Sequence, residues 1–317
     1  MMNIVVLDRN TVTNGDILLG KLDTLGNVKY YGLLTKPEII AAACDAEAII
    51  CNKAIINREA VEACSKLRYI GLFATGYNNI NLQACSEHGI MVANAPNYST
   101  NSVAQQTFAL ILQLATHICE YNTSVHDGDW VKSKQFSYFP FPIHEINGKT
   151  LGIYGFGNIG KAVANIADAF GMKVLISTRT KPENCKYEFV GREELFLRSD
   201  YLTIHSPLTP ETKEMVNSKT IGLMKKTAFL INTSRGGVIN EGDLADALNN
   251  NRIAGVGLDV LTVEPMVERN PLLTAKNCVI TPHIAWASYE ARTRLITLVA
   301  DNLRAFQNGQ PQNIVNV

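Results

Sequence analysis

Short apolar runs alternate with segments whose apolar residues recur at helical spacing, and this alternation extends along most of the chain. In the N-terminal third, the apolar runs predict strands at residues 4–7, 28–31, 49–51, 69–73 and 90–92. The helical spacing predicts helices at about residues 17–25, 37–44, 58–64 and 82–88. Because apolar strands separated by helices are typical of α/β domains, we expect a parallel sheet covered by helices on both faces.

A second alternating series begins at Thr150, after a long helix predicted at about 102–121 and an irregular, aromatic-rich arm at 127–147. Its apolar runs predict six strands, at residues 150–154, 174–177, 201–205, 228–232, 253–258 and 278–281. Six strands with intervening helices are typical of a dinucleotide-binding sheet. A final helix is predicted at about 288–307, and we expect it to pack on the first domain.

These patterns predict an α/β protein with two doubly wound parallel-sheet domains. A Rossmann-type dinucleotide-binding domain at residues 102–288 is inserted in a flavodoxin-like substrate-binding domain, which is built from residues 1–101 and 289–317. The chain has 317 residues, and this length is sufficient for two hydrophobic cores.

The glycine motif Gly155-Phe156-Gly157-Asn158-Ile159-Gly160 lies between a predicted strand and a predicted helix. Its first glycine allows a tight turn, the second lets the backbone approach a pyrophosphate, and the third lets the helix pack close to the strand. The N-terminus of the helix then faces the phosphates. We therefore predict a dinucleotide site at Gly155, Gly157 and Gly160, with an ordinary glycine-rich turn as the alternative.

Composition and charge argue against several classes of function. Lys and Arg together number 29, as do Asp and Glu, so no basic field favours nucleic acid or an anionic membrane. The sequence has no run of ~20 apolar residues, no signal-peptide pattern at its N-terminus and no zinc-type spacing of Cys and His. We therefore predict neither a membrane span nor a metal site. Seven scattered cysteines without a CxxC pair indicate reduced thiols in a cytoplasmic protein.

Three candidate catalytic side chains follow consecutive predicted strands of the second series. Arg235 follows the fourth strand, Glu264 the fifth and His283 the sixth, at the edge where open α/β sheets bind their ligands. A guanidinium offers a fork to a carboxylate, an imidazole exchanges a proton near neutral pH, and a carboxylate can orient that imidazole. With a nicotinamide, the set suits hydride transfer to a 2-keto acid. Taken singly, each has a structural alternative: a turn cap for Arg235, a solvated loop acid for Glu264 and a core histidine for His283.

From about Leu67 to the C-terminus, the chain resembles the D-isomer-specific 2-hydroxyacid dehydrogenase family. The resemblance rests on the glycine motif and on runs at residues 74–81, 94–98, 147–152, 205–209, 232–236, 257–260, 264–265 and 281–283. The runs 95–99 and 283–286 are most similar to those of glycerate dehydrogenases, also called hydroxypyruvate reductases. The resemblance implies NAD(P)H-dependent reduction of a small 2-keto acid, with hydroxypyruvate or glyoxylate as the leading substrate, to a D-2-hydroxy acid.

The resemblance also implies a role for each matching residue. Arg235 would bind the substrate carboxylate and its C2 oxygen, and His283, paired with Glu264, would protonate the forming hydroxyl. The resemblance further implies a homodimer joined through the dinucleotide-binding domain, in which an arm aromatic contributes to the dimer core or reaches the partner's active site. Thr75, Gly76 and Tyr98 would complete the substrate site, and the cofactor site would be lined by Gly155, Gly157, Asn158, Ile159, Gly160, His205, Pro207, Thr212, Thr233, Asp259 and His283.

Thr178 departs from the family pattern, in which an acid at the end of the second strand of this domain binds the ribose 2′-OH. Loss of the acid removes repulsion toward a 2′-phosphate, and Arg179 is placed to pair with one. We therefore predict cofactor contacts for Thr178 and Arg179 and predict that NADPH is accepted or preferred; the alternative is that Arg179 points to solvent and NADH binds.

Other functions stay open at this point. Leu72 and Phe73 offer no cation for a substrate phosphate, which argues against 3-phosphoglycerate as the substrate. A nucleotide-sensing regulatory protein on the same fold is one alternative, because fold alone does not separate it from an enzyme. A dehydrogenase for a different 2-hydroxy acid is another.

Overall fold

The computed structural model describes residues 1–316, and the chain forms two compact units. Unit 1 combines Met1–Ser99 with Trp286–Val317, and unit 2 is the intervening segment Thr100–Ala285. The sequence places the inserted domain at 102–288, so the limits of unit 2 differ from that expectation by two residues at the start and three at the end.

Unit 1 is built on a parallel sheet of five strands in the order β2-β1-β3-β4-β5. This is the flavodoxin-like order, so the predicted fold of this unit is confirmed. All residues of the two strands β3 and β4 are buried, because apolar clusters lie on both faces of the sheet. The strands are β1 (Asn3–Val6), β2 (Asn27–Tyr30), β3 (Ala48–Cys51), β4 (Tyr69–Leu72) and β5 (Met91–Ala93).

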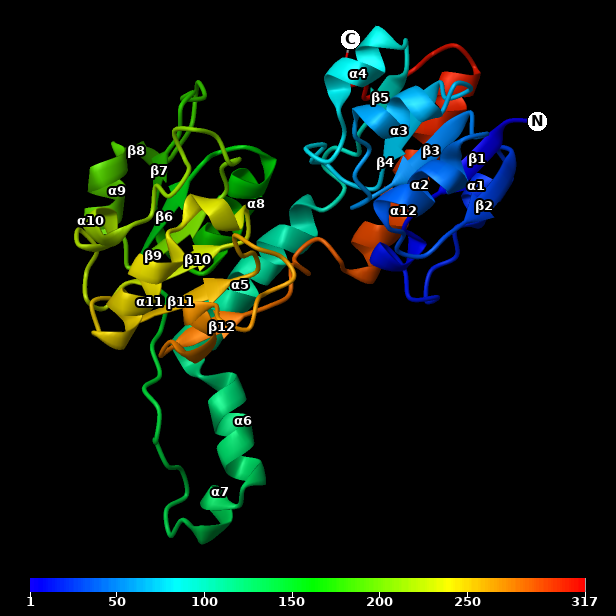
Figure 1. Cartoon of the computed structure of the whole chain (residues 1–317). Coiled ribbons are helices and arrows are strands. Elements are labelled where there is room, and N and C mark those ends of the chain that lie inside the picture. Colours follow the sequence, from blue (N-terminus) through cyan, green and yellow to red (C-terminus); the bar gives the residue numbers. More distant parts are fainter. Residues whose placement is uncertain (317) are drawn as a thin grey trace. The chain divides into compact units, whose positions relative to one another are not determined.

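Helix α12 (Tyr289–Gln307) returns from the C-terminal end of the sequence to the sheet of unit 1, where Figure 1 draws it in orange and red. The ring of Phe306 on α12 lies 4.8 Å from the ring of Tyr69 on β4. The final helix thus packs on the first sheet, as the sequence predicts. The other helices of unit 1 are α1 (Gly20–Asp23), α2 (Lys36–Ala43), α3 (Arg58–Ala63) and α4 (Leu82–Glu87), with the 3₁₀ turn η1 (Arg9–Thr11).

The helix predicted at residues 17–25 is wrong in its extent, because α1 contains only Gly20–Asp23. Ile17 and Leu19 lie in the loop that precedes α1, and their side chains are buried. The hydroxyl of Thr13 holds that loop by donating to the carbonyl of Ile17 (2.9 Å). The apolar character of these positions therefore reflects burial of a loop and not a helical face.

Unit 2 carries a parallel sheet of seven strands in the order β12-β11-β10-β9-β6-β7-β8. The order is that of a doubly wound dinucleotide-binding sheet, so the predicted Rossmann-type fold is confirmed. The sequence predicts six of these strands and misses β8, which has two residues and no apolar run. The strands are β6 (Thr150–Tyr154), β7 (Lys173–Ser177), β8 (Glu188–Phe189), β9 (Tyr201–Ile204), β10 (Phe229–Asn232), β11 (Gly255–Leu258) and β12 (Cys278–Ile280).

The single long helix predicted at 102–121 is wrong. The structure has two helices, α5 (Thr100–Thr116) and α6 (Ile118–His126), separated at His117, whose φ of 52° lies in the left-handed region. Figure 1 shows α6 and α7 (Asp129–Lys132) projecting from the body of unit 2 as part of an arm. The other helices of unit 2 are α8 (Asn158–Ala169), α9 (Arg192–Arg198), α10 (Ser218–Ile221) and α11 (Glu241–Asn249), with the 3₁₀ turns η2 (Gly236–Val238) and η3 (Pro271–Thr274).

The seven cysteines are free thiols. Cys64 and Cys85 are buried in unit 1, and burial raises the pKa of each thiol to about 11. Both are therefore protonated near neutral pH and are poor nucleophiles.

Across residues 1–316, no helix combines the length and apolar character needed to cross a bilayer. The same residues contain no group of three or more His, Cys, Asp or Glu side chains arranged to hold a metal ion.

Candidate active site

Arg235, Glu264 and His283 follow three neighbouring strands of the sheet of unit 2. Strand β10 pairs in parallel with β11, and β11 pairs in parallel with β12. Because the carboxyl ends of parallel strands meet at one edge, the three loops emerge side by side. The structure therefore brings the predicted catalytic loops to a common edge of unit 2.

The imidazole of His283 is paired with the carboxylate of Glu264. Nδ1 of His283 lies 2.7 Å from Oε2 of Glu264, and Oε1 of the same carboxylate accepts from the backbone N–H of Leu261 (2.9 Å). The carboxylate is thus fixed to the β11 loop and directs the Nδ1–H of the ring toward itself. The arrangement leaves Nε2 as the ring atom that can exchange a proton with a substrate.

Asp259 anchors the loop that carries His283. Its side chain, in a residue only 1 % exposed, accepts from the Thr281 hydroxyl (2.6 Å) and from the backbone N–H groups of Ile284 (2.9 Å) and Ala285 (2.8 Å). Burial raises the pKa of Asp259, while these hydrogen bonds oppose the rise. The sequence predicts a cofactor contact for Asp259. The structure shows a positioning contact that sequence reasoning missed, and the cofactor contact stays a prediction.

Arg235 lies in a loop that hydrogen bonds of the Asn232 side chain hold in place. The buried amide of Asn232 donates to the carbonyl of Arg235 (2.9 Å) and accepts from the backbone N–H of Ser234 (3.0 Å). The guanidinium of Arg235 makes one hydrogen bond, to the carbonyl of Ser234 (2.7 Å), and has no carboxylate partner among the described residues. Its remaining N–H groups are thus available to a substrate carboxylate.

At Gly236, the loop that contains Arg235 lies in close contact with the loop that contains Glu264. A Cβ atom on Gly236 would overlap the backbone carbonyl of Leu261, whose own N–H is held by Glu264. Only glycine allows two backbones to approach this closely. The sequence shows this glycine, but the need for it appears only once the two loops are seen in contact.

The glycine motif forms a cradle suited to a dinucleotide. Gly155 has φ 94°, and a Cβ on it would lie 2.7 Å from the carbonyl oxygen of His205, whereas a Cβ on Gly157 would meet open space. A Cβ on Gly160 would overlap the carbonyl of Gly155. Asn158 and Ile159 begin α8, and its N-cap residue Gly157 has no side chain to satisfy the first N–H groups of the helix. Those groups fit a pyrophosphate.

Unpartnered polar atoms lie next to this cradle. Both ring nitrogens of His205 and the hydroxyl of Ser206 are buried without a hydrogen-bond partner. Burial lowers the pKa of His205 to about 3, so the ring is neutral near pH 7. Buried polar groups without partners are uncommon, and they mark places where a ligand or water completes the structure. This observation also fits a cofactor site beside Gly155.

The remaining predicted cofactor residues lie on the same edge of unit 2. The hydroxyl of Thr212 donates to the carbonyl of Pro207 (2.8 Å), and the hydroxyl of Thr233 lies 3.1 Å from that of Thr107. Thr212 thus holds its own loop, whereas Thr233 contacts helix α5. Thr178 and the exposed Arg179 follow β7 directly. Direct contacts of these residues with a cofactor stay predictions.

The predicted substrate residues of unit 1 differ in exposure. The hydroxyl of Thr75 donates to the carbonyl of Ala95 (2.8 Å), which fixes an exposed loop that follows β4 and also contains Gly76. Tyr98 is only 8 % exposed, and its ring packs edge-on against Trp286 at 6.3 Å between ring centroids. The structure thus places Tyr98 largely in the core of unit 1, and its contact with substrate stays a prediction.

Comparisons with known proteins identify the family to which this chain belongs. The sequence model of "D-isomer specific 2-hydroxyacid dehydrogenase, NAD binding domain" matches residues 108–285. The chain belongs to the D-isomer specific 2-hydroxyacid dehydrogenases. A hydroxypyruvate reductase of Blautia hydrogenotrophica is 42 % identical over 99 % of this chain and 100 % of the relative. The chain is therefore an oxidoreductase, and unit 2 contains its NAD-binding domain.

Two solved structures are similar over nearly the whole chain. D-lactate dehydrogenase from Aquifex aeolicus, complexed with NAD and lactic acid, has a TM-score of 0.84 with 29 % identity and covers 99 % of both chains. An NADPH-dependent glyoxylate/hydroxypyruvate reductase from Sinorhizobium meliloti, in complex with NADP and malonate, has a TM-score of 0.83 with 27 % identity and covers 99 % of this chain and 96 % of that one. Nicotinamide cofactors of both kinds thus occur on this fold.

Proposed function

We propose that this protein reduces hydroxypyruvate or glyoxylate with NAD(P)H, giving a D-2-hydroxy acid in the case of hydroxypyruvate. The observation that carries the proposal is the 2.7 Å pairing of His283 with Glu264 at the sheet edge that also bears the Arg235 guanidinium. The name of the Blautia relative, hydroxypyruvate reductase, supports the choice of substrate. The dehydrogenase family favours an enzyme over the regulatory protein that the sequence left as an alternative.

The proposed mechanism assigns a separate task to each side chain. Arg235 binds the substrate carboxylate and polarises the C2 carbonyl through its fork of N–H donors. A reduced nicotinamide cofactor held at the glycine motif would supply a hydride to C2. The C2–O π electrons move onto oxygen, and Nε2 of His283 gives that oxygen its proton. Glu264 keeps the ring oriented and stabilises the charge on the imidazole before transfer.

A screen of 2-keto acids with each reduced nicotinamide tests the proposal directly. Hydroxypyruvate, glyoxylate, pyruvate and a bulky aromatic 2-keto acid would each be added to the purified protein, and the nicotinamide absorbance followed. We expect the highest kcat/KM for hydroxypyruvate or glyoxylate. Oxidation of neither reduced cofactor with either of these acids would contradict the proposal.

We further propose that NADPH is accepted. Arg179 is exposed, and its guanidinium has no hydrogen bond or ion pair among the described residues, so it is available to a ribose 2′-phosphate. Arg179→Ala should lower kcat/KM with NADPH and leave kcat/KM with NADH nearly unchanged. An equal effect on both cofactors, or a wild-type enzyme that strongly prefers NADH, would contradict this assignment.

We propose that the protein is a homodimer joined through unit 2. Apolar side chains of the arm are exposed, among them Phe136 at 93 %. A groove of about 620 Å³ between α5 and α8 is lined by apolar side chains that include Phe108 and Ile166. Exposed apolar surface of this kind favours a second copy of the chain. Sedimentation of the purified protein should give twice the chain mass, and Phe136→Asp should shift it toward the monomer.

We propose that backbone N–H groups at Thr75 and Gly76 also bind the substrate carboxylate. Support comes from the Thr75 loop, which is exposed yet held by the bond from Thr75 to Ala95 and by the amide of Asn94, which donates to the Thr75 carbonyl (2.8 Å). Gly76→Pro deletes one N–H group and should raise the KM for the 2-keto acid at unchanged cofactor affinity. A cytoplasmic location, based on seven free thiols, also stays a proposal.

A further inference from the structure

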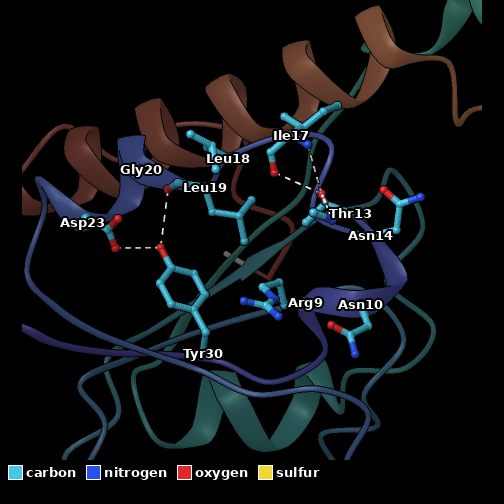
Figure 2. A pocket seen from close by; sticks show the side chains of 11 residues that line it. Arg9, Asn10, Thr13, Asn14, Ile17, Leu18, Leu19, Gly20, Asp23 and Tyr30 are labelled. Atoms are coloured by element: carbon cyan, nitrogen blue, oxygen red, sulfur yellow. Dashed lines mark hydrogen bonds between the residues drawn. The ribbon is translucent and has the colours of Figure 1, made fainter.

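Unit 1 contains a cavity of about 650 Å³ that none of the proposed catalytic, substrate or cofactor residues lines. It lies where β1 and β2 end, and Figure 2 shows its side chains from close by. Its volume falls within the range of pockets that hold small organic ligands. The lining includes Arg9, Asn10, Leu18, Leu19, Asp23 and Tyr30.

One wall of the cavity is a loop that hydrogen bonds hold in place. The hydroxyl of Thr13 accepts from the backbone N–H groups of Gly15 (3.1 Å) and Ile17 (3.2 Å). Both carboxylate oxygens of Asp16 accept from Arg292 on α12 (2.9 and 2.6 Å). The bond from Arg292 holds the pKa of Asp16 at about 2, so this pair is ionised near neutral pH. A preformed wall lowers the ordering cost of binding.

The opposite wall is formed by Tyr30, whose hydroxyl donates to the carboxylate of Asp23 (2.8 Å). Figure 2 shows this hydroxyl directed at Asp23, with the ring beside Arg9. Among the described residues, Asp23 is the only carboxylate that lines the cavity. Burial of the Tyr30 hydroxyl raises its pKa, so the hydroxyl stays protonated and donates to Asp23. The ring face of Tyr30 and the side chain of Leu19 supply apolar surface.

Among the described residues, Arg9 is the only cation that lines the cavity, and its guanidinium makes no hydrogen bond or ion pair. Its backbone is fixed, since its N–H donates to the carbonyl of Tyr31 (3.0 Å). The neighbouring Leu18 is 84 % exposed, so it presents apolar surface beside the cavity. An unpaired guanidinium next to exposed apolar surface fits a ligand with a carboxylate at one end and an apolar body at the other.

We propose that this cavity is a binding site for a small organic carboxylate with an apolar body. Arg9 binds the carboxylate, while Leu18, Leu19 and Tyr30 contact the apolar body. None of the residues proposed to bind the substrate, Thr75, Gly76, Tyr98 and Arg235, lines this cavity, so we propose it as a separate site. Inorganic phosphate fits less well, because it offers nothing to the apolar side chains of Leu18, Leu19 and Tyr30.

A second cavity, in unit 2, provides a contrast. It has a volume of about 570 Å³ and is lined by Arg192, but Glu193 and Glu194 line it as well. The two carboxylates outweigh the single guanidinium, so an anion is disfavoured there. Arg192 is therefore a matched control: an exposed arginine in a cavity of similar size where no carboxylate is expected to bind.

Calorimetric titration with 3-phenylpropanoate tests the proposal, with the neutral amide 3-phenylpropanamide and inorganic phosphate as comparison probes. We expect saturable binding of the acid and at least tenfold weaker binding of the amide and of phosphate. Arg9→Gln should weaken binding of the acid roughly tenfold or more, since a hydrogen-bonded charge is lost. Arg192→Gln and Arg235→Gln should both bind it as the wild type does.

Binding that survives Arg9→Gln but is lost in Arg235→Gln would overturn the proposal, because the acid would then occupy the candidate active site. Equal binding of acid and amide would overturn it as well, since it would show that the cavity does not recognise the carboxylate. The comparison of acid with amide uses the unmodified protein and tests recognition of the carboxylate, while the comparison of Arg9→Gln with Arg235→Gln assigns that recognition to one of the two sites.

Discussion

The backbone N–H of His283 donates to the backbone carbonyl of Asp259 (2.8 Å), so the proposed proton donor is held by a residue on the neighbouring strand end. The same aspartate binds the backbone on the far side of His283, at Ile284 and Ala285. Asp259 therefore holds the backbone on both sides of His283, and Glu264 holds its imidazole ring. This double support explains how a partly exposed histidine keeps a fixed direction.

Replacement of Asp259 by Asn should impair catalysis through the position of His283. An amide cannot accept all the hydrogen bonds of the carboxylate, and one buried donor left unsatisfied costs about 1–3 kcal/mol. We expect a lower melting temperature and a kcat reduced roughly tenfold or more. Steady-state kinetics and calorimetry on the same preparation check both effects. Wild-type kcat together with wild-type stability would show that Asp259 does not position His283.

Gly236→Ala should strongly reduce activity, because the added methyl group would overlap the Leu261 backbone and force the Arg235 and Glu264 loops apart. A displacement of about 1 Å at reacting groups can cost roughly 100-fold in rate. Gly191→Ala is the control, because a Cβ there has no neighbour within 4 Å and the backbone φ is −66°. Measured kcat/KM should fall for Gly236→Ala alone; similar values for the two variants would refute the close-contact argument.

The buried His205 should make the free energy of unfolding depend on pH. Its pKa is lowered to about 3 by burial, so the unfolded chain binds a proton below about pH 6.5 that the folded protein does not. Stability therefore falls as pH drops from about 6.5, by up to about 1.4 kcal/mol per pH unit. Between about pH 6.5 and 5 most carboxylates stay ionised, which limits their contribution to this dependence.

Denaturant unfolding across that pH window checks the prediction for His205. The variant His205→Asn lacks the titrating ring and should show a flatter dependence of stability on pH than the wild type. His126→Gln, at the exposed end of α6, serves as the control and should retain the wild-type slope. A His205→Asn protein with the wild-type slope would mean that another group titrates.

Most of the strands could be predicted from the sequence, because buried parallel strands are short apolar runs between helices. It missed β8, since Glu188 and Phe189 carry no such run. It also missed the break at His117, because apolar residues continue at helical spacing on both sides of that residue. A helix break that does not interrupt the spacing of the apolar residues cannot be predicted from that spacing.

Within the site, the strand ends that carry Arg235, Glu264 and His283 could be located from the sequence, because parallel strands deliver their loops to one edge. The positioning role of Asp259 could not, since it depends on which atoms the carboxylate meets after the β12 loop has folded. The same holds for the unpartnered nitrogens of His205. Residue type and spacing identify chemistry, whereas tertiary contacts decide which residues support it.

Replacement of His283 by Ala tests the central claim most directly. With hydroxypyruvate or glyoxylate and the preferred reduced nicotinamide, kcat should fall by roughly 100-fold or more, because the proton donor is lost. The variant His126→Ala, in the arm, should behave as the wild type. A His283→Ala enzyme that turns over at close to the wild-type rate would contradict the assignment of this imidazole as the proton donor.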